Sequence, residues 1–355
     1  MLTFLRSLLS PKPGNPERVT STYRQLEPPT HVTAPGVEPL AISASLEYIN
    51  GLPVPDWEAV SKWVESVPIS EDQAQAWAAC EKAWLQHLGL ALGAGYHLAE
   101  HGGALLLSSL EDKIASATLN FMIKTLERIT RVLAGVAQAP EWGSDILIVL
   151  DDEEIYYRYV SRYYHEDGEF AASSGMHIGG GCSHFVTMKS DLRSVEPVIA
   201  HEMTHACLSH LPIPAWLNEG IAVNTELKLC PAPPPMFTPR EMHEKHLQFW
   251  GADEIQQFWS GKSFLRNDDG NMLSYDLARI LVAQFSSEWE SFREFVLAAN
   301  LTDAGASAAY EFLGLDLGAA AAAILEQEPD DRWHPNPDTW EEAPEKGAFR
   351  EIVGT

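Results

Sequence analysis

Basic residues are scarce in this sequence of 355 residues: there are 24 Lys and Arg against 50 Asp and Glu, and the formal net charge is −26. Proteins that bind nucleic acid neutralise phosphates with clustered Lys and Arg, and anionic membranes attract basic rather than acidic segments. The charge balance therefore argues against a nucleic-acid partner and against docking on a membrane. It favours solubility instead.

Cysteine and long apolar runs are also scarce. The four cysteines, Cys80, Cys182, Cys207 and Cys230, form no C-x-x-C pair, and a secreted protein with a disulfide framework would contain more. No apolar run is long enough to span a bilayer, and the N-terminus, MLTFLRSLLSPKPG, lacks the core and cleavage site of a signal peptide. We expect a cytoplasmic protein with reduced thiols.

The composition and hydrophobic pattern divide the chain into four parts. Residues 1–40 are rich in Pro and Thr and are expected to form an extended arm, followed by a helical N-terminal segment at 41–94. Residues 95–328 are the predicted main domain, and residues 329–355 read as an acidic, Pro-rich tail. Because 45% of the residues are hydrophobic, the chain can bury a core.

Periodicity and turn residues predict a mixed half followed by a helical half, which is an α+β pattern. One helix should start near Pro55, and another should start with Ser70 as N-cap and Gln73 completing a capping box. The remaining expected elements are a hairpin at 95–110, helices at 112–136 and 153–164, a buried strand at 145–150, paired or bent strand at 176–188, and mostly helix from 191 to 327 with a break at 231–235.

The sequence HEMTH at 201–205 is the most specific pattern in the chain. It lies in a predicted helix that Ser194 caps. Residues four apart on a helix lie on the same face, so the imidazoles of His201 and His205 can converge on one ion. Glu202 projects about a quarter-turn away, where it can reach a water molecule on that ion without binding the ion itself.

Two imidazoles and an oxygen ligand suit Zn²⁺, with the fourth position left to water. The metal would lower the pKa of that water, and Glu202 would accept its proton during attack on a carbonyl. The pattern therefore predicts a zinc site with Glu202 as general base.

The third ligand has several candidates. A histidine six residues after the second would suit another type of zinc protease, but Leu211 stands there, and His210 lies about half a turn round the helix. Glu219 is better placed, because Pro214 can open a second helix that folds back across the first. Apolar neighbours predict that Glu219 is buried, and a buried carboxylate needs a partner. Glu226, two turns later, could orient a ligand histidine.

The stretch AHEMTH…PAWLNEGIA resembles the gluzincin class of zinc metallopeptidases, and within it the peptidase MA-like domains, in which an H-E-x-x-H helix is followed closely by a W-L-x-E-G-x-A helix. The resemblance implies that His201, His205 and Glu219 bind zinc and that Glu202 is the general base. It also implies a zincin-like fold over 95–328, with a small mixed sheet lobe, the active-site helix and a helical C-terminal lobe. The implied activity is cleavage of a peptide or protein substrate.

Two further roles follow from this resemblance. A tyrosine in a later helix of such proteins can face the metal, and Tyr275 in LSYDLARILV is the candidate for stabilising the oxyanion. Zincins bind peptides along an edge strand above the catalytic helix, which is expected here at 176–188. The glycines at 179–181 would let a substrate backbone approach, and His177 or His184 would line the cleft.

Other residues of ligand type are expected to be structural. The segment HEKH at 243–246 is interpreted as a charged helix face, and Cys207 as a core residue. The chain also departs from thermolysin-like members, which place an aspartate four residues beyond the glutamate ligand, where Val223 stands here. It has no G-x-M-E-N segment of the aminopeptidase kind.

Three hypotheses are compatible with these patterns. The first is an active zinc peptidase. The second is a catalytically inactive zincin-fold metalloprotein that acts as a binding or structural module, and the third is a scaffold without metal. Glu202 favours the first, because a structural zinc site needs no base and usually closes its fourth position with a protein ligand.

Overall fold

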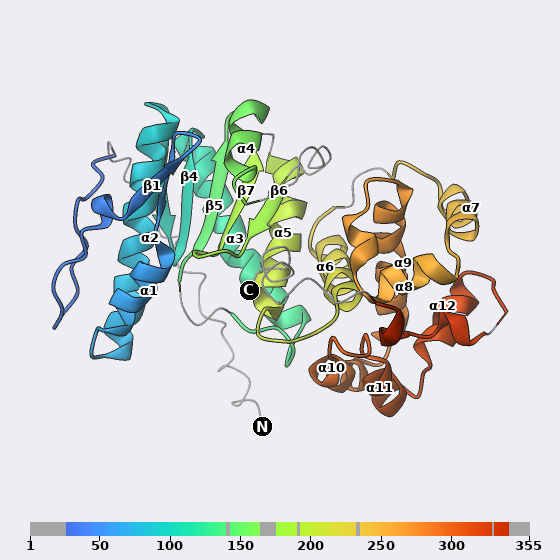
Figure 1. The fold of residues 1–355 in the computed structure, drawn as a ribbon. Coiled ribbons are helices and arrows are strands. Elements are labelled where there is room, and N and C mark those ends of the chain that lie inside the picture. The colour runs from blue at the N-terminus through green and yellow to red at the C-terminus, as the bar shows by residue number, and fades with distance from the viewer. Residues whose placement is uncertain are drawn as a thin grey trace, which may run out of the picture.

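The computed structural model describes residues 26–139, 143–163, 175–189, 192–231, 235–328 and 330–340. These residues form a mixed α+β fold, as expected, with a small sheet and many helices. Figure 1 shows two halves: the sheet with its helices, coloured blue to yellow-green, and a helical half, coloured yellow to red. None of the described helices is long and apolar enough to cross a membrane.

The main sheet has five strands in the order β3-β4-β5-β7-β6. The central strands β4, β5 and β7 are parallel, and the outer strands β3 and β6 are antiparallel to their neighbours. The strands are β3 (His97–His101), β4 (Ala104–Ser108), β5 (Asp145–Leu150), β6 (Gly175–Ile178) and β7 (His184–Met188). The expected hairpin at 95–110, strand at 145–150 and strand pair within 176–188 are confirmed.

The described α-helices carry the labels of Figure 1. They are α1 (Trp57–Glu65), α2 (Ser70–Leu92), α3 (Asp112–Val132), α4 (Glu153–Val160), α5 (Leu192–Leu208), α6 (Ala215–Leu229), α7 (Pro239–Phe249), α8 (Ala252–Trp259), α9 (Asp269–Phe285), α10 (Trp289–Ala298), α11 (Ala306–Ala308) and α12 (Leu317–Ile324). Short 3₁₀ turns and one π-helical turn connect several of them.

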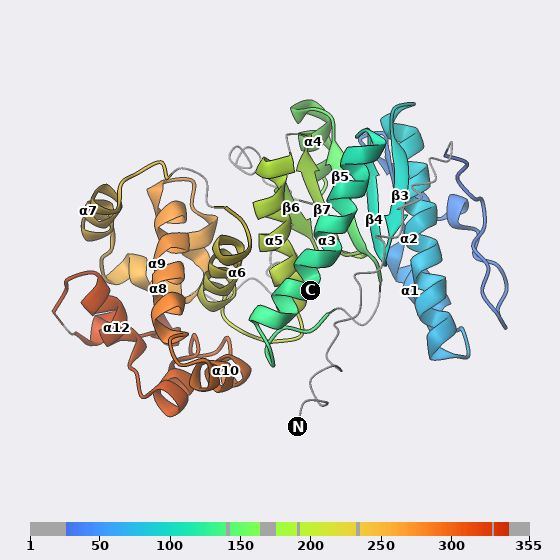
Figure 2. The ribbon, with the colours of Figure 1, turned by 180° about the vertical axis from the view of Figure 1, so that it is seen from behind.

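Helices cover both faces of the sheet. Leu147 and Val149 of β5 belong to the core that contains α3 and α5, whereas Ile146 and Ile148 belong to the core that contains α2 and α4. Figure 2 shows α3 and α5 in front of the sheet. Because successive side chains of a strand point to opposite faces, a strand covered on both faces is apolar throughout. This explains the apolar run at 146–150 in β5.

A two-stranded hairpin before α1 was not predicted. Its strands are β1 (Leu46–Ile49) and β2 (Leu52–Pro55), joined by Asn50 and Gly51 with φ angles of 52° and 77°. Two central residues with positive φ define the turn that matches the twist of a hairpin, and Asn-Gly is its preferred sequence. The expectation of a purely helical segment at 41–94 is therefore wrong at its start.

Two predicted helix caps are also wrong. Ser70 is already helical, and Ile69 occupies the N-cap without a side-chain bond. The amide of Gln73 donates to the carbonyls of Glu65 and Val67, so it ties the α1–α2 turn instead of closing a capping box. Ser194 likewise lies inside α5, which begins at Leu192.

The described part of the N-terminal arm packs on the helices of the sheet half. Val32 is buried, the indole of Trp63 donates to the carbonyl of Glu38, and a ring nitrogen of His87 lies 3.0 Å from the carbonyl of Pro29. Residues 1–25 of the predicted arm lie outside the described residues. Residues 26–40 therefore lie on α1 and α2, at the end of the molecule away from α6 (Figure 1).

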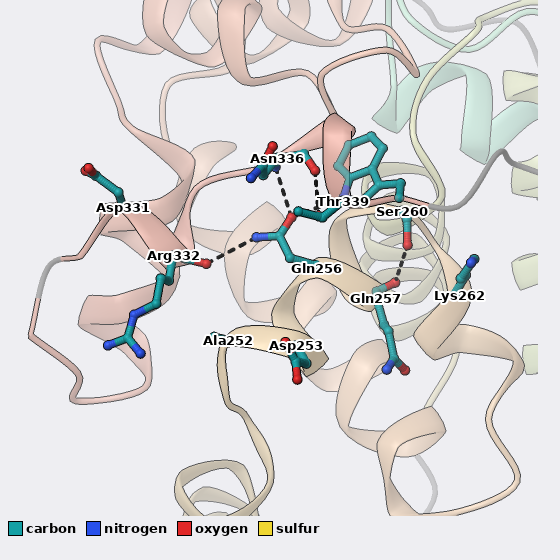
Figure 3. Close-up of a pocket in the computed structure, with 11 residues that line it drawn as sticks. Ala252, Asp253, Gln256, Gln257, Ser260, Lys262, Asp331, Arg332, Asn336 and Thr339 are labelled. Atoms are coloured by element: carbon teal, nitrogen blue, oxygen red, sulfur yellow. Dashed lines mark hydrogen bonds between the residues drawn. The ribbon is translucent and has the colours of Figure 1, made fainter.

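The segment from 331 to 340, which the sequence suggested is part of a tail, packs against α8. Gln256 holds it by donating to the carbonyls of Arg332 and His334 and accepting from the backbone of Asn336. Figure 3 shows this contact beside a cavity of about 550 Å³ between α8 and the segment. Trp333 is buried, which fixes the segment on the helical half.

A buried carboxylate joins three parts of the sheet half. Glu81 of α2 is 2% exposed and accepts from the indole of Trp77 and from the backbone N–H of Ser144, just before β5. The thiol of Cys182, in the turn between β6 and β7, also faces it at 3.8 Å. Burial raises the pKa of Glu81 to about 7, although these hydrogen bonds oppose the shift.

This carboxylate should make stability depend on pH. Glu81 keeps its proton in the folded protein up to about pH 7, whereas the unfolded chain releases it near pH 4.5, so the folded state loses stability as pH rises between these values. In urea unfolding, Glu81 should lower the free energy of unfolding of the native protein by about 3 kcal/mol over this pH interval. The Glu81→Gln variant should lack this decrease. Glu71→Gln, an exposed carboxylate on the same helix, should keep the native profile. Parallel profiles for Glu81→Gln and the native protein would contradict the assignment.

Candidate metal centre

Helix α5 carries the HEMTH pattern and is anchored on the sheet. Ile199, Ala200 and Met203 are buried in the core shared with α3 and the sheet. Helical periodicity then turns His201 and His205 toward α6. Pro197 lies inside this helix rather than at its first turn, because the helix begins at Leu192.

Helix α6 crosses α5 after the turn that contains Pro212 and Pro214, as predicted, and Pro214 is its N-cap. Trp216 and Leu217 are fully buried. Gly220 lets α9 approach closely, because a Cβ at this position would lie 2.6 Å from the carbonyl oxygen of Ala278. The neighbouring Glu219 therefore belongs to a helix fixed on both sides, against α5 and α9.

Three atoms from these two helices converge. His201 Nε2 lies 3.1 Å from His205 Nε2, and Glu219 Oε2 lies 3.3 Å and 3.4 Å from these two nitrogens. Glu219 Oε2 is buried and has no hydrogen-bond partner among the described residues. Such a triangle of lone pairs needs a proton or a cation at its centre, because the atoms otherwise repel one another.

This triangle fits a tetrahedral metal ion. Zinc bonds of about 2.0–2.1 Å place tetrahedral ligand atoms roughly 3.3 Å apart, close to the observed separations. Three protein ligands leave a fourth position for a small molecule, and no other group of His, Cys, Asp and Glu in the described part of the chain converges in this way. His201, His205 and Glu219 can therefore hold a metal ion.

A second set of contacts orients the two imidazoles. His205 Nδ1 lies 2.9 Å from Asn218 Oδ1, and His201 Nδ1 lies 3.2 Å from Glu226 Oε2. When each Nδ1–H donates to its oxygen, each Nε2 presents its lone pair to the centre of the triangle. Glu226 was expected in this role, whereas Asn218 was missed. Its signal in the sequence is a single amide within the buried run AWLNEGIAV.

The site is acidic enough to bind a cation. Burial alone would lower the pKa of His201, but the carboxylates of Glu219 and Glu226 raise it well above its ordinary value. Burial alone would raise the pKa of Glu219, but the two imidazoles hold it far below its usual range. The negative charge of the Glu219 carboxylate is thus stabilised by the protonated imidazoles of His201 and His205.

Two further predicted residues lie next to this cluster. Glu202 follows the first histidine on α5, and burial raises the pKa of its carboxyl, against the opposing effect of the two imidazoles. Tyr275 of α9 lies with its ring centroid 6.4 Å from that of His201 and packs edge-on against Phe264. The ring of Tyr275 therefore lies near His201, and the catalytic roles of Glu202 and Tyr275 stay predictions.

Other predicted residues lie elsewhere. His184 is 1% exposed on the opposite face of the sheet, bonded to the hydroxyl of Tyr159, so the expectation that it lines the cleft is wrong. The side chain of His177 lies outside the described part of the structure. His210 is exposed, and Cys207 is a core residue, both as predicted.

The segment at 243–246 is only partly a charged face. His243 pairs with Glu326 and is partly exposed, but His246 is 3% exposed. Its Nε2 lies 3.0 Å from Asp276 Oδ2, and its Nδ1 accepts from the indole of Trp250. His246 therefore ties α7 to α9 inside the helical half, because α9 supplies its carboxylate partner.

We compared the sequence with protein-family models and with curated proteins. No family model matches the chain, and no curated protein is significantly similar to it. The gluzincin resemblance accordingly rests on the short motif alone, and the site's chemistry must be argued from its geometry.

Asn218 provides a direct test of this geometry. Replacing it by Leu removes the acceptor that orients His205, and zinc affinity measured by competition with a chromophoric chelator should fall by about 10- to 100-fold. Asn218→Asp keeps an acceptor oxygen and should bind zinc at least as tightly as the native protein. Native affinity in Asn218→Leu would show that the contact does not orient a ligand.

Proposed function

We propose that this protein is a zinc-dependent hydrolase that cleaves peptide bonds in a peptide or protein substrate, with a zincin-like fold. The observation that carries the proposal is the triangle of His201 Nε2, His205 Nε2 and Glu219 Oε2 with edges of 3.1–3.4 Å. It is supported by a carboxylate, Glu202, that lies beside the triangle without belonging to it.

Glu202 acts as the general base in this proposal. Zinc held by the three ligands would polarise a water molecule and lower its pKa. The Glu202 carboxylate takes the proton from that water during attack on the scissile carbonyl, and then delivers it to the departing amine. Its position one residue after His201 on a rigid helix keeps it close to the site throughout the reaction.

Tyr275 supports the negative charge that forms on the carbonyl oxygen. Its hydroxyl donates a hydrogen bond to this oxyanion, whose charge grows toward the transition state. Phe264 packs edge-on against the tyrosine ring with 5.2 Å between centroids, which limits the positions that the ring can adopt. The helix that carries it is held against α6 by the close contact at Gly220.

Strand β6 is the proposed docking edge for the substrate. Among the described strands it lies at one edge of the sheet, next to β7, and it contacts α5. Gly175 allows this contact, because a Cβ there would lie 2.5 Å from Val198 of α5. An extended peptide can pair with such an edge through its backbone. A Cβ on Gly181 of the glycine turn would lie 2.3 Å from the ring of Trp57, so this ring occupies one side of the turn.

The general base is tested by Glu202→Gln. This variant should bind one zinc per chain, because its three ligands are untouched, and should lose at least about 1,000-fold in kcat on a peptide library, because no group then accepts the proton. Metal content by atomic absorption and cleavage by mass spectrometry provide the two readouts.

Glu244→Gln, which changes an exposed carboxylate of α7, serves as the matched control and should cleave like the native protein. Equal cleavage by Glu202→Gln would exclude the proposed base. Zinc uptake without cleavage of any library peptide by the native protein would favour the alternative, a catalytically inactive metal-binding module.

The oxyanion role predicts a specific kinetic effect for Tyr275→Phe. Its kcat should fall by about 100- to 1,000-fold while KM and zinc content stay near native values, because the lost hydrogen bond strengthens only in the transition state. Tyr310→Phe, at a tyrosine that is 73% exposed, is the control. A rise in KM with native kcat would instead assign Tyr275 to substrate binding.

A further inference from the structure

A second cavity lies in the sheet half, at the amino end of β5. It has a volume of about 540 Å³ and is bounded by α1 and α2 on one side and by α3 and α5 on the other. The turn between β6 and β7 closes part of it. This volume lies in the range of cavities that hold small organic ligands.

The charges around this cavity are all of one sign. Glu65, Glu81 and Asp145 line it, and no Lys, Arg or His stands among its described lining residues. The cavity of Figure 3 differs, because Lys262 and Arg332 share its wall with acidic groups. A cavity with only carboxylates repels anions and attracts cations.

Glu81 is buried and Asp145 is half-buried, and neither has a cationic partner among the described residues. Glu81 is 2% exposed and its hydrogen bonds come from neutral groups, Trp77, Ser144 and Cys182. Burial raises the pKa of Asp145 to about 6, with no opposing positive charge. A carboxylate accepts about four hydrogen bonds, so both groups retain free acceptor capacity.

The remaining wall is aromatic and apolar. Trp77 and Phe185 contribute rings, and Val64, Leu126 and Ile146 contribute aliphatic groups. Aromatic faces attract organic cations through their quadrupole and also cover an apolar ligand body. Carboxylates beside indole and phenyl rings therefore match a ligand that has a charged amine at one end and an apolar group at the other.

We propose that this cavity binds a small organic ammonium compound, whose N–H groups donate to the carboxylates of Glu81 and Asp145 while its apolar body lies against Trp77 and Phe185. The site is separate from the metal cluster and does not depend on the proposed peptidase activity. One lining residue, Ala206, directly follows the zinc-ligand candidate His205 on α5. None of the three candidate ligands lines the cavity.

The test compares two ligands that differ only in charge. Phenethylammonium should bind the full-length protein at pH 8 with a Kd below about 1 mM in isothermal calorimetry, and 2-phenylethanol should bind at least about tenfold more weakly. Equal affinities, or no phenethylammonium binding at about 10 mM, would overturn the proposal.

Variants locate the binding. Asp145→Asn and Glu81→Gln should each weaken phenethylammonium binding by at least about fivefold, and Glu58→Gln, an exposed carboxylate on α1, should not. If Glu81→Gln loses its native circular dichroism, Asp145→Asn decides. His201→Ala should keep full affinity, so a failed peptidase assay leaves this result intact. Loss of affinity in His201→Ala, or native affinity in Asp145→Asn, would place the ammonium elsewhere.

The affinity should also follow the protonation of the two carboxylates. The other titratable groups near Glu81 are Cys80, Cys182 and Glu65, and the one near Asp145 is Cys207. The carboxyls gain protons as pH falls from 8 to 5, whereas the thiols stay neutral, so binding should weaken by at least about tenfold over this interval. Affinity independent of pH would contradict recognition by the carboxylates.

Discussion

The convergence of three possible ligand atoms from two helices is the constraint on which the candidate metal centre depends. Two imidazole nitrogens and a carboxylate oxygen lie within 3.1–3.4 Å of one another, and one of them is buried without a hydrogen bond. The rest of the fold holds these three atoms together. Helix α5 is packed on the sheet, and α6 is packed between α5 and α9, so the positions of both helices are fixed by their neighbours.

Polar contacts around the three atoms orient the imidazole rings of the two histidines. Asn218 and Glu226 each accept from the Nδ1 side of a histidine, which leaves both Nε2 lone pairs aimed at one point. Both acceptors come from α6, the helix that supplies Glu219. A single helix therefore provides the third candidate ligand and both orienting groups, so a shift of α6 relative to α5 would affect all of them together.

Buried acidity recurs away from the metal centre. The chain has an excess of 26 acidic groups, most of which can remain solvated at the surface, but Glu81 and the half-buried Asp145 are drawn into the base of the sheet. At the candidate metal centre the buried Glu219 has imidazoles for partners, whereas Glu81 has only neutral hydrogen-bond donors and burial alone raises the pKa of Asp145. A buried carboxyl group is thus charged beside the imidazoles, whereas carboxyl groups buried without a cationic partner tend to keep their protons.

Local periodicity was enough to predict the helix with two stacked histidines, the buried strand at 145–150 and the hairpin at 95–110, because each depends on neighbours within a few residues. The Asn50-Gly51 hairpin was not predicted, although it depends on an equally local signal, two turn residues with positive φ. The sequence could also nominate Glu219, but its meeting with the histidines required two helices to cross.

For two histidines, burial was decided by the tertiary structure. His184 and His246 belong to segments that suggested a cleft and a charged face, yet both are buried with partners 25 and 30 residues away in the chain. The contact of Asn218 with His205 and the close approach of α9 at Gly220 also follow from packing between elements. Spacing along a chain fixes which side of an element a residue occupies, whereas packing between elements decides what that side meets.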